Sequence, residues 1–428
     1  MWENEEHKNL VRNIIIFAVL VVVAAALLIT MFAVKKRINA EDELLKAESD
    51  SQRQELNNVR KDNLDSVQVA YDADLAALQE YLPGIVCWGD SLTAGSSGSV
   101  SYPGTLQKYI NTYMCDIYDL ASTLDNAEGY SRVDWSQYTV SIPVVNMGSG
   151  KETSETILGR SGVEPYVLSA DMEIPADTES VAIQFRSEDN KEVKPLTAGN
   201  VGFNPVTIGG VEGTITLETN TQSWGQSYYF TRSTAGDPVT VEKGTQIIPA
   251  CTDAYKDYIH IVWLGTYDGV DDPAKLVSDT KELLSRQAKN PDRYLVLGPC
   301  TVRGSWTSAN VTTMEAIDSA MMQAFGSHYV NIRKYLLADG MTDAKFSVTK
   351  EDKVVIQQSM VPISFRSNSV TGADLNGSAY RLIGKLVYDR MSSLGYFDEV
   401  RQELGLDKTT QDILKNNPKY FENILNAM

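Results

Sequence analysis

A serine directly after a short apolar run is the residue in this sequence whose position most clearly suggests chemistry. The stretch from Gly84 to Gly95 reads GIVCWGDSLTAG, so the apolar run ends in Gly-Asp-Ser. This pattern predicts a buried strand that breaks sharply into a loop and leaves Ser91 just past the strand's carboxyl end. Ligands bind at that edge in open α/β sheets, so Ser91 is a candidate nucleophile.

Carboxylates are predicted to lie near the same edge of the sheet. Asp90, Asp268 and Asp374 all fall close to the predicted carboxyl ends of the strands. Clustered carboxylates can bind a hard cation through their oxygens. The alternative is that Asp90 and Asp268 hydrogen-bond the backbone of their loops. We favour the second interpretation and predict neither a metal site nor a cofactor.

The histidines are poorly placed to act as a base for Ser91. The chain has three, and His260 and His328 stand at the beginnings of predicted strands, while His7 precedes a long apolar stretch. In a parallel sheet the beginnings of the strands lie roughly 13–17 Å from the edge that carries Ser91, at about 3.3 Å per residue. We therefore predict structural roles for His260 and His328.

The body of the protein is predicted to be α/β. Short apolar runs predict buried strands at Val86–Trp88, Val144–Asn146, Ile259–Leu264, Tyr294–Leu297 and Tyr329–Ile332. Helical patterns lie between several of them, at Pro273–Gln287 and Thr312–Phe325. This alternation predicts a parallel sheet with helices on both faces, built from residues 83–163 and 251–396.

Residues 164–250 have a different pattern. They contain the runs VAIQF, NPVTIGGVEGTITLE, SYYFTR and PVTVEKGTQIIP, in which β-branched and aromatic residues alternate with Gly, Pro and Asn breaks. We predict an all-β insertion between the second and third strands of the sheet. Inserted modules of this kind shape a cleft, bind a partner or serve only as structure. Residues 397–428 are predicted to form a short helical tail.

The motif around Ser91 resembles block I of the SGNH/GDSL hydrolases, in which the serine of a Gly-Asp-Ser-Leu motif attacks esters. Further segments match the family's layout and order, namely VVNMGSGKETSETILGRSG, HIVWLGTYDG, FGSHYVNIRKYL and LNGSAYRLIGKLVY. The resemblance covers roughly residues 84–396 apart from the insertion. It implies the flavodoxin-like, three-layer parallel sheet of the SGNH hydrolase fold.

The resemblance also implies positions for the catalytic groups. Such an enzyme needs a nucleophile, a base and donors aimed at the oxyanion. Ser91 would supply the nucleophile and one backbone donor. Block II reads GSGKE, so Lys151 follows Gly150 at the position of the family's donor glycine. Block III reads GTYD, so Tyr267 replaces the asparagine that precedes Asp268. A tyrosine hydroxyl lies several ångströms further from the backbone, and we expect it to pack in the cleft or cover it.

Block V departs furthest from the family. Where the family has Asp-x-x-His-Leu-Asn, this chain reads TGADLN, which places Asp374 at the histidine position and Thr371 at the aspartate position. A solvated carboxylate with a pKa near 4 is a weak base for a serine hydroxyl. Losing the base of a serine triad costs several orders of magnitude in rate. The predicted cleft, lined by Asp90, Gly150 and Asp268, therefore has the nucleophilic serine but lacks the histidine, aspartate and asparagine that act with it in the family.

The N-terminal region predicts a membrane anchor. Ile14–Val34 is an uncharged apolar run of roughly the length that spans a bilayer as a helix, after a short tail at residues 1–13. Lys35, Lys36 and Arg37 follow the span, against Lys8 and Arg12 before it. The positive-inside rule would then place the large domain in the cytoplasm. The family resemblance implies the opposite, since anchored members usually act outside the cell, and we favour an extracellular domain.

Residues 35–82 are predicted to form a helical stalk between the membrane and the body. The segment is charged and lacks proline and glycine before Pro83, and its leucines and valines recur at spacings typical of an amphipathic helix. Two interpretations stay open. The thin apolar seam could pair two copies of the chain as a coiled-coil homodimer, or the helix could be a solvated spacer.

Charge and cysteine content limit the partners. The formal net charge is -18, so the chain offers no basic surface to neutralise nucleic-acid phosphates. The four cysteines form no CxxC pair, which argues against a zinc site. Cys87 is predicted to be a buried free thiol, and one disulfide among Cys115, Cys251 and Cys300 is left open.

Two functions from different classes follow. The first is a surface-anchored hydrolase fold that has lost its base and binds a glycan or a protein partner through the old cleft or the β insertion. The second is an active ester hydrolase, for example a deacetylase of cell-envelope polysaccharide, that uses Asp374 or the substrate as its base. The missing histidine and the replacement at Tyr267 favour the first.

Overall fold

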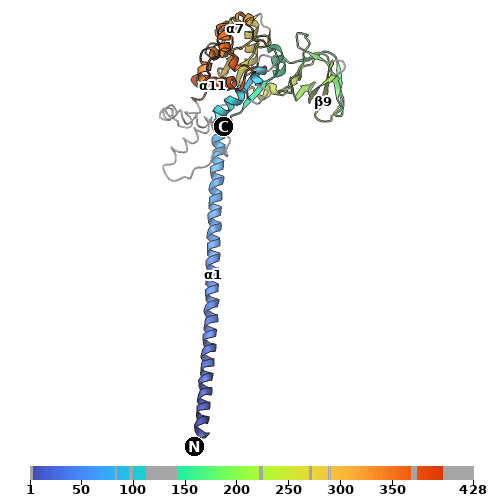
Figure 1. Ribbon diagram of the computed structural model, residues 1–428. Helices are drawn as coiled ribbons and strands as arrows, with labels where there is room; N and C mark the ends of the chain where they lie inside the picture. The colour runs from blue at the N-terminus through green and yellow to red at the C-terminus, as the bar shows by residue number, and fades with distance from the viewer. Residues whose placement is uncertain are drawn as a thin grey trace. The chain divides into compact units, whose positions relative to one another are not determined.

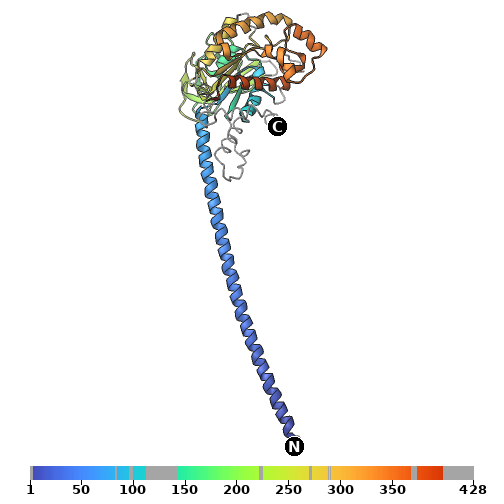
Figure 2. The same ribbon diagram turned by 90° about the vertical axis from the view of Figure 1, so that its left-hand side faces the viewer.

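The N-terminal region is one long helix, α1, over Glu3–Tyr81. The computed structural model describes residues 3–81, 84–95, 100–111, 142–220, 225–268, 272–287, 289, 291–367 and 374–398. The chain divides into two compact units within α1, Met1–Ala76 and Ala77–Met428. Both the predicted span and the predicted stalk lie in α1, which is unbroken in both views (Figures 1 and 2).

The first half of α1 is a candidate membrane span. Its apolar side chains are largely exposed, with Phe17 and Ile29 each 70% accessible. In water such exposure would be unfavourable, whereas in lipid it is the stable arrangement. By length and composition α1 holds one stretch apolar enough to cross a bilayer, a property that signal sequences share.

The central sheet of the second unit is parallel, as predicted. Its strands are β1 (Ile85–Gly89), β2 (Val144–Gly148), β12 (Ile259–Trp263), β13 (Tyr294–Leu297) and β14 (Tyr329–Val330), in the order β14-β13-β12-β1-β2. The last strand is shorter than predicted. It ends at Val330 because Asn331 caps the next helix, α8 (Ile332–Tyr335), by accepting a hydrogen bond from the Lys334 N–H at 2.9 Å.

Helices cover both faces of the sheet. On one face α4 (Ser154–Ser161), α6 (Pro273–Leu284) and α7 (Val311–Phe325, labelled in Figure 1) pack on a core that includes Val86, Val262 and Val296. Successive strand residues point to opposite faces. Trp263 therefore faces the other side, where its ring lies 5.6 Å from that of Tyr102.

The second face is covered by a helix at residues 102–111 and by α11 (Gly377–Ser393). These two helices touch, since a Cβ added to Gly384 would lie 2.5 Å from Cβ of Thr105. Further short helices in the described part of the body include α5 (Cys251–Ala254), η2 (Ser308–Asn310), η3 (Gly326–His328), η4 (Leu336–Gly340), α9 (Met341–Asp343), α10 (Lys350–Gln357) and η5 (Ile363–Phe365). The observed body is thus a parallel sheet between two layers of helices.

Capping residues set the helix ends. α6 begins where Asp272 accepts hydrogen bonds from the N–H groups of Ala274 and Lys275, with Pro273 in the first turn. It ends at Leu284, three residues before the predicted Gln287, whose side chain instead bonds the backbone of Lys289 and Arg293.

The segment between β2 and β12 is rich in antiparallel strands. They are β3 (Val167–Leu168), β4 (Met172–Ile174), β5 (Val181–Ile183), β6 (Phe185–Arg186), β7 (Val206–Ile208), β8 (Val211–Asn220), β9 (Gly225–Arg232), β10 (Val239–Val241) and β11 (Ile247–Pro249). The larger sheet has the order β11-β7-β8-β9-β5, and the pairs β10-β4 and β3-β6 form small ribbons. Gly209 and Gly210, both with positive φ, make the tight turn between β7 and β8.

These strands bury side chains of their own. The cluster includes Tyr166, Phe203, Ile215 and Phe230, each at most 1% exposed, and it is separate from the core beneath the parallel sheet. The segment therefore has a hydrophobic core of its own. Figure 1 labels β9 in this part of the chain.

The described chain ends at residue 398, just after α11. Tyr396 and Phe397 are buried, and most of the predicted helical tail at residues 397–428 lies outside the described residues.

Cys87, Cys251 and Cys300 are free and buried, while Cys115 lies outside the described part. Burial raises the pKa of the Cys87 thiol to about 12, so it is protonated and unreactive at neutral pH.

Candidate functional site

The turn after β1 places Ser91 at the carboxyl edge of the sheet. Ser91 is the first residue of a short helix, α2 (Ser91–Ala94), where the sequence had predicted a loop. Asp90 caps this helix, since its Oδ1 accepts the Leu92 N–H at 2.8 Å. Gly89 is required because a Cβ there would lie 2.1 Å from Oγ1 of Thr93. The Gly-Asp-Ser order thus makes the turn tight and presents the serine.

The Ser91 hydroxyl is hydrogen-bonded to Tyr267. Its Oγ lies 2.9 Å from the phenol oxygen, and either oxygen can donate. Tyr267 belongs to the loop after β12, and its ring lies against the backbone of Gly304, where a Cβ would come within 2.6 Å of Cε1. Gly304 has a φ of 63° and donates its N–H to the carbonyl of Thr266 at 3.0 Å. The phenol is therefore held over Ser91 by a neighbouring loop.

The phenol is neutral at physiological pH. Burial raises the pKa of Tyr267, and the charges of Asp90 and Asp374 raise it further, while the bond to Ser91 lowers it. A neutral phenol can donate or accept a hydrogen bond, but it cannot remove a proton from a serine hydroxyl. Tyr267 thus hydrogen-bonds the Ser91 hydroxyl but does not take up its proton.

Asp90 is the carboxyl group nearest to Ser91 in the chain, and it is almost fully buried. Burial raises the pKa of Asp90 to about 7, with smaller contributions in the same direction from Asp268 and Glu152, while hydrogen bonding from Leu92 lowers it. Its second oxygen, Oδ2, has no hydrogen-bond partner among the described residues. The group is partly protonated at neutral pH, and its bond to Leu92 fixes it as a cap.

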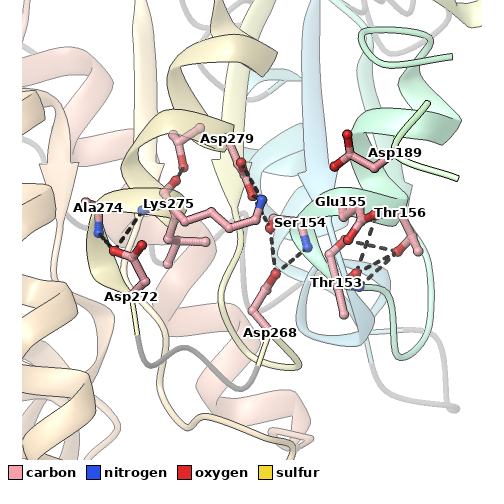
Figure 3. Close-up of polar contacts among 12 residues, drawn as sticks. Thr153, Ser154, Glu155, Thr156, Asp189, Asp268, Asp272, Ala274, Lys275 and Asp279 are labelled. Carbon is pink, nitrogen blue, oxygen red and sulfur yellow. Dashed lines mark hydrogen bonds and ion pairs between the residues drawn. The ribbon is translucent and has the colours of Figure 1, made fainter. Parts of the chain in front are cut away.

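Asp268 does not point to a shared cation site but to the start of α4 (Figure 3). Its Oδ1 accepts the Ser154 N–H at 2.7 Å and the Ser154 hydroxyl at 2.6 Å. Asp90 thus bonds the backbone of its own turn, as the favoured interpretation expects, whereas Asp268 bonds the first residue of a helix 114 positions away. In the part of the chain that the structure describes, no group of three His, Cys, Asp or Glu residues is placed to hold a metal.

A second carboxylate, that of Asp279, also contacts the Ser154 hydroxyl. Ser154 Oγ lies 2.5 Å from Oδ2 of Asp279, and Asp279 is ion-paired with Lys275 at 2.8 Å (Figure 3). The Ser154 hydroxyl has one proton, so it can donate to only one carboxylate at a time. Burial raises the pKa of Asp268 and the charge of Asp279 adds to this, while the bonds from Ser154 lower it. This arrangement ties the loop after β12 to the start of α4.

Lys151, at the family's donor-glycine position, keeps a glycine-like backbone. Its φ is 61°, in the left-handed region that side chains other than glycine adopt at a cost. The loop is anchored at Ser149, whose N–H donates to the carbonyl of Gly89 at 3.0 Å. Gly150 and Lys151 therefore follow β2 directly beside the turn that carries Ser91.

Asp374, which the resemblance places at a base position, lies before α11. Asp374 is partly exposed, and its carbonyl accepts the Ser367 N–H at 2.9 Å. Its charge raises the pKa of Tyr267, so the carboxylate lies within electrostatic reach of the phenol. Thr371 lies outside the described residues. Asn376 caps α11, since its Oδ1 accepts the Ser378 N–H at 3.1 Å.

The two histidines of the body lie at the opposite edge of the sheet, as predicted. His260 pairs with Val86 near the start of β1 and contacts the carbonyl of Tyr255 at 3.1 Å. Burial lowers its pKa to about 4, so the ring is neutral. His328 stacks on Tyr294 at 4.4 Å between ring centroids. Neither imidazole reaches Ser91.

A largely buried ion pair between Arg160 and Glu152, which no pattern in the sequence predicts, stabilises the loop after β2. Arg160 and Glu152 are 2.7 Å apart with side chains 3% and 13% exposed. Arg160 also donates to the carbonyls of Met147 at 2.8 Å and Val201 at 2.8 Å. The spacing of eight residues between Arg160 and Glu152 gives no signal, because a helix neighbour would be three or four residues away.

Comparison with known proteins gives little further information. No protein-family model matches the sequence, and no curated protein matches it. Among solved structures, a peptidoglycan O-acetylesterase aligns at 10% identity with a TM-score of 0.26, covering 75% of this chain and 95% of that chain.

Proposed function

We propose that this protein is a membrane-anchored, SGNH hydrolase-like module that binds its ligand without turning it over. The hydrogen bond between Ser91 and Tyr267 is the observation that carries the proposal. Ser91, at the nucleophile position, is hydrogen-bonded to a neutral phenol in place of a base. The strand order β14-β13-β12-β1-β2 supports the flavodoxin-like arrangement expected of this fold. The antiparallel strands between β2 and β12 support an inserted β module.

The chemistry of the site favours binding over hydrolysis. Ester hydrolysis by serine requires a base within hydrogen-bond reach of Oγ. Among the described residues, the side chain that hydrogen-bonds Ser91 Oγ is Tyr267, and the imidazoles of His260 and His328 lie at the other edge of the sheet. We propose a glycan or a protein at the cell surface as the ligand, because the candidate membrane span would hold the domain beside the envelope.

A second function is favoured by one observation. The charge of Asp374 raises the pKa of Tyr267, so the carboxylate lies within electrostatic reach of the phenol that bonds Ser91. In an active esterase, Asp374 would serve as the base through the phenol. This alternative predicts a low but real turnover that depends on all three side chains.

The test is ester hydrolysis by the full-length protein in detergent micelles. We expect the rate with p-nitrophenyl acetate to equal that of Ser91→Ala, and a fluorophosphonate probe to leave Ser91 unlabelled. A Ser91-dependent rate would overturn the proposal in favour of the active esterase. Ser393→Ala is a matched control, because that hydroxyl is exposed and bonds only the carbonyl of Arg390.

A gain-of-function variant identifies the cause of inactivity. Asp374→His combined with Thr371→Asp and Tyr267→Asn rebuilds the groups that the family resemblance implies. We expect this triple variant to hydrolyse p-nitrophenyl acetate and to lose that activity on adding Ser91→Ala. Folding of the triple variant is checked by circular dichroism, so that a misfolded protein is not mistaken for an inactive one.

The extracellular placement has its own test. We expect protease added to intact cells to remove the domain after α1 and to leave the N-terminal residues protected. Full protection of the domain, with cleavage only after lysis, would contradict this placement.

A further inference from the structure

A groove beside the Ser91 turn has walls from two parts of the chain. One wall consists of residues 149–152 and Thr156, the other of residues 194–198, and the space between them is about 430 Å³. The first wall follows β2 and begins at Ser149, which bonds the carbonyl of Gly89 at 3.0 Å, two residues before Ser91. The second wall belongs to the strand-rich segment that precedes β7. The volume lies within the range of small-ligand sites in proteins.

Both walls carry a side chain on a left-handed backbone. Lys151 has a φ of 61° on the first wall, and Leu196 has a φ of 66° on the second. This conformation is unfavourable for residues other than glycine, and such residues cluster at ligand sites. The walls approach each other closely, since a Cβ added to Gly150 would lie 3.5 Å from Cβ of Ala198.

The groove is positively charged on a protein that is otherwise acidic. Each wall contributes one lysine, Lys151 and Lys194, whereas the whole chain carries a net charge of -18. The groove's one acidic residue, Glu152, is neutralised by Arg160 at 2.7 Å. Lys194 is paired with Glu192 at 3.3 Å, but that pair is exposed, with side chains 60% and 75% accessible. An exposed pair of this kind is weak and leaves the ammonium available to a ligand.

The remaining lining residues favour a hydroxylated ligand. Ser149 and Thr197 offer hydroxyl oxygens; the proton of Thr197 goes to the carbonyl of Lys194 at 3.2 Å, so this hydroxyl can accept, whereas the Thr156 hydroxyl is used in the cap of α4. Among the lining residues there is no aromatic side chain to anchor a peptide, and aromatic anchors dominate binding at protein interfaces. Two ammonium groups and two hydroxyl oxygens along one groove match a chain of sugars that carries carboxylates.

We propose that this groove binds an acidic oligosaccharide, with carboxylates against Lys151 and Lys194 and sugar hydroxyls against the hydroxyl oxygens of Ser149 and Thr197. The inference rests on the proposed function, because it names the ligand class of a binding site beside Ser91. It does not depend on whether Ser91 turns over an ester.

Binding to the full-length protein in detergent micelles tests the proposal. The probe is a hexamer of galacturonic acid, and its full methyl ester is the neutral counterpart of the same length. Isothermal titration calorimetry should detect the acidic hexamer and not the ester. Lys151→Gly removes one ammonium while suiting the left-handed backbone, and Lys194→Gln removes the other. Each should weaken binding roughly fivefold, the equivalent of about 1 kcal/mol for an exposed charge pair.

Lys243→Gln is the matched control, because this exposed lysine lies in the strand-rich segment and does not line the groove. It should bind the hexamer as wild type does. Equal binding of the methyl ester, unchanged affinity in both lysine variants, displacement by inorganic phosphate at equal concentration, or no binding would each overturn the proposal. Ser91-dependent hydrolysis would refute the proposed function and leave these binding results unaffected, so the two failures are distinguishable.

Discussion

The phenol oxygen of Tyr267 lies 2.9 Å from the hydroxyl oxygen of Ser91. The loop behind it, where Gly304 makes room for the ring, fixes Tyr267 in this position. The contact ties the serine to a group that is neutral at physiological pH, since burial raises the pKa of the phenol. It also provides a way to separate the binding protein from the esterase.

Tyr267→Phe should leave the hydrolytic rate at background and lower stability by about 1 kcal/mol, the usual cost of one hydrogen bond. Thermal unfolding and p-nitrophenyl acetate hydrolysis are measured on the same full-length sample. Tyr335→Phe, which removes an exposed phenol bond to Asp343, is the stability control. If the wild type has a Ser91-dependent rate and Tyr267→Phe abolishes it, the phenol has a catalytic role.

Asp90→Asn should make stability less dependent on pH. Burial raises the pKa of Asp90 to about 7, against an ordinary value of 3.8, so the folded state holds this proton more tightly than the unfolded state. The contribution of Asp90 to stability is therefore full below about pH 4 and is lost as the pH rises towards 7, by on the order of several kcal/mol. Asparagine keeps an oxygen that can cap Leu92.

The measurement is the unfolding free energy of wild type and Asp90→Asn between pH 4.5 and pH 7.5. The advantage of the variant should grow with pH. Asp253→Asn, at a side chain that is 85% exposed, should show no such trend. A constant difference between Asp90→Asn and wild type would mean that the carboxyl is already ionised across this range.

Lys151→Gly should stabilise the fold by about 1 kcal/mol. Glycine adopts a φ of 61° without the steric penalty that a Cβ incurs, and the relief outweighs the added freedom of the unfolded chain. Chemical denaturation of the full-length protein measures the change. Lys243→Gly, at a residue outside the positive-φ set, should instead lower stability. A destabilised Lys151→Gly would show that the side chain makes a favourable contact in the groove.

Ser154→Ala should destabilise the link between α4 and the loop after β12. The variant leaves Asp268 without a hydroxyl donor and removes the group between Asp268 and Asp279, a loss of roughly 1–3 kcal/mol. The loss should be larger at pH 8 than at an acidic pH, because protonation of Asp268, whose pKa burial raises, removes its repulsion of Asp279. Ser285→Ala, at an exposed serine, is the control, and an equal effect at both pH values would argue against repulsion between the two carboxylates.

Local signals in the sequence are sufficient to predict the main helices and strands. The apolar run before Gly89 predicts β1, the uncharged stretch Ile14–Val34 predicts a long apolar helix, and the strand and helix alternation predicts a parallel sheet. Each depends on residues that are neighbours in the chain, where periodicity and capping act. The placement of His260 and His328 at the far edge follows from strand direction alone.

The contacts at the site depend on packing between distant segments. The bond from Tyr267 to Ser91 joins residues 176 positions apart, and it needs the Gly304 loop to hold the ring. The bond from Ser154 to Asp268 likewise joins residues 114 positions apart. Residue types determined which groups stand near the edge of the sheet, and only the tertiary structure determined which of them touch. The reason is that a side chain's partner depends on the loops packed around it, which no local pattern encodes.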